Sequence, residues 1–272
     1  MPELPEVETT RRGLAPTLLR QRIRGAVVRN RALRLPVPAR LAKCVAGATV
    51  ERVDRRGKYL LIVCDRGTLI VHLGMSGRLW LVAPGTPPAK HDHFDLVLES
   101  GPVVRLRDPR RFGLVLWQDK DEATHTLLAR MGPEPFGAQF SGQWLYEETR
   151  RRSAAIKQVL MDSHVVAGVG NIYASEALFR AGINPRSPAQ RISRKRYASL
   201  VEHIRATLAD AIEAGGSTLR DYVGSNGEAG YFQNQFLVYG RSGEPCLRCG
   251  TTVKELKQGQ RSTFYCPRCQ RS

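Results

Sequence analysis

The sequence lacks any long apolar run. No stretch of the 272 residues approaches the roughly 18 consecutive apolar residues that a membrane-spanning helix requires. The first ten residues, MPELPEVETT, also lack the basic and apolar regions of a secretory signal. We therefore expect a cytoplasmic protein with no membrane partner.

Acidic residues are scarce relative to basic ones. The chain has 42 Lys and Arg against 25 Asp and Glu, a formal net charge of +17. Such an excess predicts a polyanionic partner, of which nucleic acid is the first candidate. Hydrophobic residues make up 42% of the chain, which excludes a wholly disordered protein, and the length suggests about two domains.

Cysteines are few, and four of the six are concentrated near the C-terminus. Cys246 and Cys249 form one close pair, and Cys266 and Cys269 form a second after 16 intervening residues. Two such pairs are typical of four thiolates around one zinc ion, whereas two disulfides would conflict with a cytoplasmic location. Four cysteine ligands leave no open position for water, so we expect one structural zinc. Cys44 and Cys64 are interpreted as thiols without a chemical role.

Hydrophobic periodicity predicts an α+β chain. Residues 3–19 have helical spacing, and short alternating runs between Ile23 and Trp117 indicate an antiparallel sandwich or flattened barrel. Helical spacing returns at 144–161, 172–181 and 194–214, where Gly215 and Gly216 end the last helix. The predicted parts are a β-sandwich domain at 1–131, a Gly- and Pro-rich linker at 132–142, a helical domain at 143–235 whose residues 216–235 form a mobile loop, and a zinc finger at 236–272.

Three segments have features of nucleic-acid contacts. The sequence DPRRFG at 108–113 combines arginines with Phe112 and predicts a wedge that enters a base stack, although a surface hairpin is the plainer interpretation. Gly168 and Gly170 precede Asn171, where a helix N-terminus would bind an anion unless the glycines only form a packed turn. The basic residues among the C-terminal cysteines, Arg261 among them, predict phosphate contacts or a solvated charged surface.

The N-terminal Met-Pro pair suggests a nucleophile. Most such prolines have no chemical role, because Met-Pro usually only permits removal of the methionine. A freed Pro2, however, has a secondary amine whose pKa of about 8 lies below that of lysine. This amine can attack a sugar C1′ and form a Schiff base, while the neighbouring Glu3 donates a proton.

Taken together, these motifs resemble the formamidopyrimidine-DNA glycosylase family over essentially the whole chain. The similar segments are MPELPEVET, RGKYLL, HLGMSG, KHDHFD, DPRRFG, GVGNIYASE, VYGR and GQRSTFYCPRCQ, in this order. The resemblance implies a two-layered β-sandwich with an N-terminal helix, joined to a helix-two-turn-helix domain with a β-hairpin zinc finger. It implies a bacterial enzyme of the cytosol and nucleoid, active as a monomer without a small-molecule cofactor.

The resemblance also implies roles for individual residues. The catalytic group comprises Pro2 as nucleophile, Glu3 as general acid, the active-site Lys58, and Arg261, which holds phosphate. Glu6 belongs to the same N-terminal pocket. The implied DNA contacts are His72, Met75, His91, Arg110, Arg111, Phe112, Lys157, Asn171 and Tyr239, of which Met75, Arg110 and Phe112 fill the space left by a flipped nucleotide. The implied lesion lid comprises Ser217, Leu219, Arg220, Asp221 and Tyr222.

The implied activity is excision of oxidised purines, namely 8-oxoguanine and formamidopyrimidines, from damaged duplex DNA. Strand cleavage by β- and δ-elimination follows. Two alternatives remain open at this point. An enzyme of the endonuclease VIII type has the same nucleophile but prefers oxidised pyrimidines, although LPEVET favours the purine enzyme. A non-enzymatic zinc-ribbon protein would explain the charge and the cysteines, but not Pro2 and Glu3.

Overall fold

The computed structural model of the chain describes residues 2–217 and 231–271. These residues form two compact units. The first contains 2–129, 214–217 and Tyr231, and the second contains 130–213 and 232–271. No helix among them is both long and apolar enough to cross a membrane.

The first unit is a sandwich of two four-stranded antiparallel sheets. One sheet has the order β1-β6-β7-β5 and comprises Ile23–Val28, Asp92–Leu98, Val103–Arg107 and Arg78–Val82. The other has the order β2-β3-β4-β8 and comprises Val50–Arg56, Tyr59–Cys64, Gly67–His72 and Leu114–Asp119. The sandwich that the alternating pattern predicted is thus confirmed. The unit also contains two short helices, α2 (Leu41–Val45) and α3 (Thr126–Ala129).

The core of this unit forms because alternate strand residues point inward. In β3, Leu60, Ile62 and Cys64 are buried, whereas the residues between them are partly exposed. Leu69 and Val71 of β4 join the same apolar cluster. Burial of one face of each strand is what the period of two residues requires in a sandwich.

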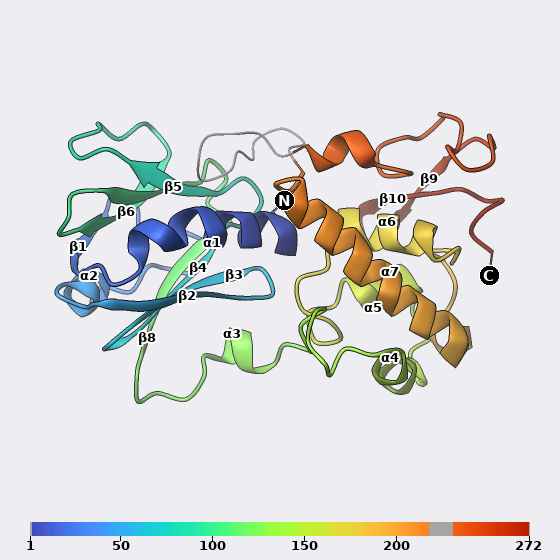
Figure 1. Cartoon of the computed structure of the whole chain (residues 1–272), viewed down its shortest axis with the longest axis horizontal. Helices are drawn as coiled ribbons and strands as arrows, with labels where there is room; N and C mark the ends of the chain where they lie inside the picture. Colours follow the sequence, from blue (N-terminus) through green and yellow to red (C-terminus); the bar gives the residue numbers. More distant parts are fainter. Residues whose placement is uncertain (1, 218–230, 272) are drawn as a thin grey trace. The chain divides into compact units, whose positions relative to one another are not determined.

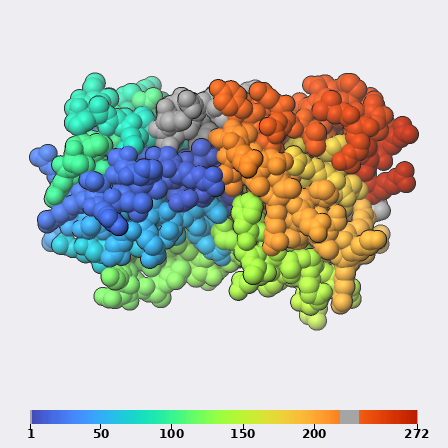
Figure 2. Space-filling model, viewed as in Figure 1, coloured from blue at the N-terminus to red at the C-terminus, as the bar shows by residue number. Residues whose placement is uncertain are grey.

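Helix α1 (Leu4–Leu18) contacts strands of both sheets, and Figure 1 shows it running alongside them. Its inner side contributes Val7, Leu14 and Leu18 to the core. Its outer side includes the exposed Arg12 and lies at the visible surface in Figure 2. The helix is therefore held in place by packing against both sheets.

The second unit is helical, with a two-stranded hairpin. Its helices are α4 (Gly142–Thr149), α5 (Ile156–Leu160), α6 (Asn171–Arg180) and α7 (Arg194–Glu213), with short 3-10 turns η1 (Ala189–Arg191) and η2 (Phe232–Gln235). The hairpin comprises β9 (Lys254–Gln258) and β10 (Arg261–Tyr265). Helix α7 contacts α4 and α6, and α6 contacts β10. Gly215 has a φ of 74° just beyond the end of α7, as a helix-terminating glycine requires.

The prediction of one continuous helix over residues 144–161 was wrong. The run 144–161 is divided into α4 and α5 by an irregular segment. The carbonyls of Arg152 and Ala154 accept hydrogen bonds from the N–H groups of Gln190 and Ala189, instead of continuing a helical ladder. Tertiary hydrogen bonds thus override a local helical preference.

Candidate functional site

The first residues of α1 lie inside the first unit. Pro2 and Glu3 are both buried. The Glu3 N–H donates a 2.7 Å hydrogen bond to Glu6 Oε2, while the Glu3 carboxylate accepts from the backbone N–H of Glu6. This reciprocal capping box holds the Glu3 side chain at the helix N-terminus, next to Pro2.

Glu6 connects the start of α1 to a distant segment of the same unit. Its Oε1 accepts hydrogen bonds from the Ser217 N–H at 2.8 Å and the Ser217 hydroxyl at 3.1 Å. Gly216 has a φ of +84°, and a Cβ there would lie 3.0 Å from the same carboxylate, so a side chain would be strained and crowded. The other residues of the predicted lid, Leu219, Arg220, Asp221 and Tyr222, lie outside the described residues.

Lys58 occupies the tight turn between β2 and β3. Arg56 pairs with Tyr59 across the hairpin, and Gly57 supplies a positive φ of 55°. The next strand places His72 opposite Tyr59, with ring centroids 4.8 Å apart. The sheet register thus brings Lys58 near His72.

His72 is neutral at physiological pH. Burial, together with the charges of Lys58 and Arg34, lowers its pKa from 6.5 to about 4. Its Nδ1 accepts a 2.9 Å hydrogen bond from the Gly74 N–H. The proton of the neutral ring therefore lies on Nε2. This N–H can donate a hydrogen bond to a phosphate oxygen.

A pH dependence of stability follows from this lowered pKa. The unfolded histidine takes up a proton near pH 6.5 and the folded one near pH 4, so acidification across this range favours unfolding. His72 should contribute up to about 3 kcal/mol to the fall in unfolding free energy. Urea unfolding at pH 7.5 and pH 4 should therefore show a smaller decrease in a His72→Gln variant than in the wild type. Equal decreases in unfolding free energy in the two proteins would contradict this assignment. Protonation of the carboxyl groups lowers the stability of both proteins alike, so the comparison cancels that effect.

The carboxylate of Asp108, the first residue of DPRRFG, connects the loop of this segment to the loop of HLGMSG. The Ser76 hydroxyl donates to Asp108 Oδ1 at 3.1 Å, and the Gly113 N–H donates to Oδ2 at 2.7 Å. A Cβ on Gly74 would lie 2.4 Å from the backbone of residues 112 and 113, which shows how closely the loops approach. Asp108 is buried and therefore joins the loops from within.

These two loops present apolar side chains to the surface. Met75 is 40% exposed and Phe112 is 43% exposed. The Arg110 guanidinium lies 4.8 Å from the centre of the Phe112 ring, and Arg111 adopts a φ of 57°. His91 belongs to the same region, because its carbonyl accepts from the Asp108 N–H at 3.0 Å. The predicted wedge residues and His91 thus occupy one part of the first unit.

Asn171 begins α6 in the second unit, as predicted for a helix N-terminus. Its Nδ2 donates to the Tyr239 hydroxyl at 3.2 Å and to the Ser262 carbonyl at 3.1 Å. Arg261 precedes Ser262 at the start of β10. These contacts bring Asn171, Tyr239 and the beginning of β10 together, a cluster of donors suited to phosphate oxygens.

Lys157 does not lie at the surface. It is 1% exposed, and its ammonium donates to the Ser262 carbonyl at 2.9 Å and to the Thr263 hydroxyl at 2.7 Å. In this structure the Lys157 ammonium supports the backbone and side chains at the start of β10. The direct contact implied by the resemblance stays a prediction.

Glu176 has a supporting function that the sequence analysis missed. The side chain is fully buried, and its carboxylate accepts hydrogen bonds from the N–H groups of Leu237, Val238 and Tyr239 at 2.8 to 3.0 Å. Burial raises its pKa despite these donors. The carboxylate holds the backbone that carries Tyr239. The signal in the sequence was an acidic residue within the otherwise uncharged run IYASEALF.

The four C-terminal cysteines form a metal site. Their sulfur atoms all lie within 4.8 Å of one another, with separations of 3.9 Å between Cys246 and Cys269 and 3.5 Å between Cys249 and Cys266. Tetrahedral zinc with Zn–S bonds of about 2.3 Å requires sulfur separations of about 3.8 Å, so the residues fit one zinc ion. The β9–β10 turn beside them has positive φ at both Gly259 and Gln260, which favours a tight hairpin.

The two units define a zinc-containing DNA-binding protein, and comparisons identify its family. Consecutive parts match the formamidopyrimidine-DNA glycosylase N-terminal domain at 1–115, the H2TH domain at 131–223 and the zinc finger found in FPG and IleRS at 243–271. The chain belongs to the formamidopyrimidine-DNA glycosylase family.

The chain aligns with individual relatives over essentially their full lengths. Formamidopyrimidine-DNA glycosylases of Janthinobacterium sp. and Stutzerimonas stutzeri are each 58% identical, and each comparison covers 100% of both chains. The crystal structure of the MutM (Fpg) protein from Thermus thermophilus is 40% identical, with a TM-score of 0.88 over 99% of this chain and 98% of the other. The Lactococcus lactis Fpg in complex with abasic-site DNA is 34% identical, with a TM-score of 0.91 over all of both chains.

Proposed function

We propose that this protein excises oxidised purines from duplex DNA and then cleaves the strand, with the amine of Pro2 as nucleophile. The observation that carries the proposal is the buried start of α1, where a capping box holds Glu3 beside Pro2. Full-length similarity to formamidopyrimidine-DNA glycosylases supports the same activity.

Removal of Met1 would leave Pro2 with a secondary amine. Its lone pair attacks C1′ of the damaged nucleotide, and Glu3 protonates the sugar ring oxygen or the departing base. The C1′–N bond of the base breaks as the Pro2–C1′ bond forms, and the Pro2 nitrogen gives up its proton. The C1′–O4′ bond of the sugar ring then breaks, O4′ takes a proton, and the lone pair of the Pro2 nitrogen forms a C=N⁺ bond to C1′. The resulting iminium acidifies the C2′ proton, so β-elimination releases the 3′ phosphate oxygen, and δ-elimination releases the 5′ one. The zinc ion, held by four cysteines, has a structural function in this scheme.

The chemistry requires a nucleotide turned out of the duplex. Met75, Arg110 and Phe112 occupy the vacated space and offset the few kcal/mol lost on unstacking. Lys58, His72, Asn171, Tyr239 and Arg261 hold the phosphates around the lesion. Because its substrate is chromosomal DNA, the protein works in the bacterial cytosol and nucleoid. It acts there as a monomer, as the family resemblance implies.

A comparison of substrates tests this function. Single-turnover assays should show faster cleavage of a duplex with 8-oxoguanine opposite cytosine than of one with thymine glycol, by about tenfold or more. Undamaged duplex serves as the control. A preference for thymine glycol would favour the endonuclease VIII alternative, and binding without cleavage of either lesion would favour the zinc-ribbon alternative.

A further inference from the structure

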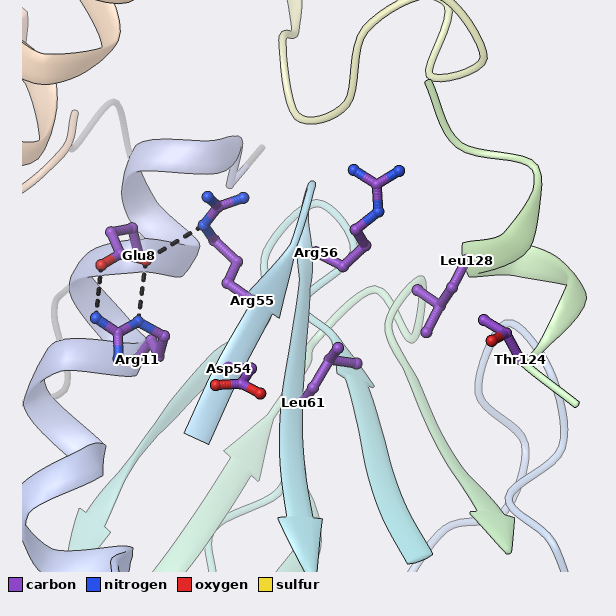
Figure 3. Close-up of a pocket in the computed structure, with 8 residues that line it drawn as sticks. All are labelled: Glu8, Arg11, Asp54, Arg55, Arg56, Leu61, Thr124 and Leu128. Carbon is purple, nitrogen blue, oxygen red and sulfur yellow. Dashed lines mark hydrogen bonds and ion pairs between the residues drawn. The ribbon is translucent and has the colours of Figure 1, made fainter. Parts of the chain in front are cut away.

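Glu8 connects the helix that carries Pro2 and Glu3 to strand β2. Its carboxylate accepts hydrogen bonds from Arg11 and Arg12 on its own helix, at 2.8 to 3.0 Å. It also accepts a 3.2 Å bond from Nε of Arg55, which lies 47 residues later in β2. Figure 3 shows Glu8 between Arg11 and Arg55. Of these three guanidinium partners, only Arg55 lies outside α1.

The connection continues to the turn that holds Lys58. The terminal nitrogen Nη1 of Arg55 donates to the Gly57 carbonyl at 3.0 Å. One guanidinium therefore contacts the helix through Glu8 and the β2–β3 turn through the residue before Lys58. A second contact between α1 and β2 runs from Arg11 to the Val53 carbonyl at 3.2 Å.

Burial and charge distinguish the contact of Glu8 with Arg55 from its contact with Arg12. The side chains of Glu8 and Arg55 are 12% and 11% exposed, whereas that of Arg12 is 59% exposed. Burial raises the pKa of Glu8, but the guanidinium groups outweigh this effect and the net shift is downward. The carboxylate is thus charged at neutral pH and bonds to Arg55 with little competition from water.

A hollow of about 530 Å³ lies beside these contacts, bordered by Arg11, Asp54, Arg55, Arg56 and residues of the α3 region. Close apolar packing does not fill this space. The ionic contact therefore connects α1 to the turn at the edge of this hollow, in addition to the apolar packing of Val7 and Val53 in the core.

We propose that Glu8 and Arg55 are positioning residues. They hold the turn that carries Lys58 at a fixed position relative to Pro2 and Glu3 at the start of α1. This inference rests on the proposed function, because it concerns the geometry of the same reaction. Small displacements of reacting groups reduce rates strongly while leaving most binding contacts in place.

Arg55→Gln and Arg12→Gln form a matched pair of variants. Each removes one positive charge and one bond to Glu8, but only Arg55 reaches the Lys58 turn. Arg55→Gln should lower the single-turnover excision rate by about tenfold or more, and Arg12→Gln by less than about twofold. Both should bind a tetrahydrofuran-containing duplex with nearly wild-type affinity. Equal losses of rate in the two variants would overturn the proposal.

A double-mutant cycle with Glu8→Gln separates positioning from general stability. Circular dichroism and thermal unfolding establish a temperature at which every variant is folded. There, the Glu8→Gln, Arg55→Gln double variant should be no slower than Arg55→Gln alone, because both changes break one connection. Multiplicative losses would contradict the connection. A wild type without excision would refute the proposed function, whereas an active wild type with an equally active Arg55→Gln variant would refute only the positioning.

Discussion

Protein that retains Met1 is expected to form no covalent adduct with 8-oxoguanine duplex in the presence of borohydride. It should also excise the base at least about 10³-fold more slowly than Met-processed protein. The reason is chemical: in the Met1–Pro2 bond the proline nitrogen is an amide and has no basic lone pair. Once Met1 is removed, the same nitrogen is a secondary amine. Adduct formation is measured by gel shift and by the mass of the reduced product.

The control for this experiment is a Met-processed sample whose N-terminal mass is verified. Both samples should bind a tetrahydrofuran-containing duplex, since the exposed DNA-contact loops lie elsewhere in the chain. Undiminished turnover by the sample that retains Met1 would exclude Pro2 as the nucleophile.

Glu3→Gln should lower base excision by about 10² to 10⁴-fold, the usual contribution of a general acid. Glutamine keeps an oxygen that can accept the Glu6 N–H, so the capping box at the start of α1 should persist in part. What it loses is the carboxyl proton. Cleavage of a preformed abasic site should be less affected than excision, because no base then has to leave.

Glu99→Gln provides a charge-matched control. Glu99 is half exposed and pairs with Arg22 at the surface at 3.4 Å. The Glu99→Gln variant should excise the damaged base at nearly the wild-type rate. Its affinity for DNA should equal that of the Glu3→Gln variant. If Glu3→Gln also excised at that rate, Glu3 would not be the proton donor.

Local patterns predicted those parts of the fold that depend on nearby residues. The alternation in Tyr59–Cys64 was sufficient to identify a strand, because one face of that strand packs into the core. The spacing of Cys246, Cys249, Cys266 and Cys269 was sufficient for the metal site, because the geometry of zinc restricts the sequence directly.

The supporting contacts could not be predicted in this way. Glu176 meets residues about 60 positions away, Lys157 meets Ser262, and Glu8 meets Arg55. Nothing near Lys157 in the sequence indicates that its ammonium is buried. Such contacts depend on the tertiary arrangement of elements, which periodicity does not specify. The resemblance implied roles for side chains without indicating what holds them in place.

Because Asp108 bonds to both loops, the Met75 loop and the Phe112 loop form a single preorganised surface. Their position relative to each other is therefore established when the chain folds. In the proposed complex the two side chains would enter and leave the base stack as one unit, so the entropy lost on binding is smaller than for two independent loops. A single buried carboxylate would in this way influence how fast the enzyme releases one site and searches for the next.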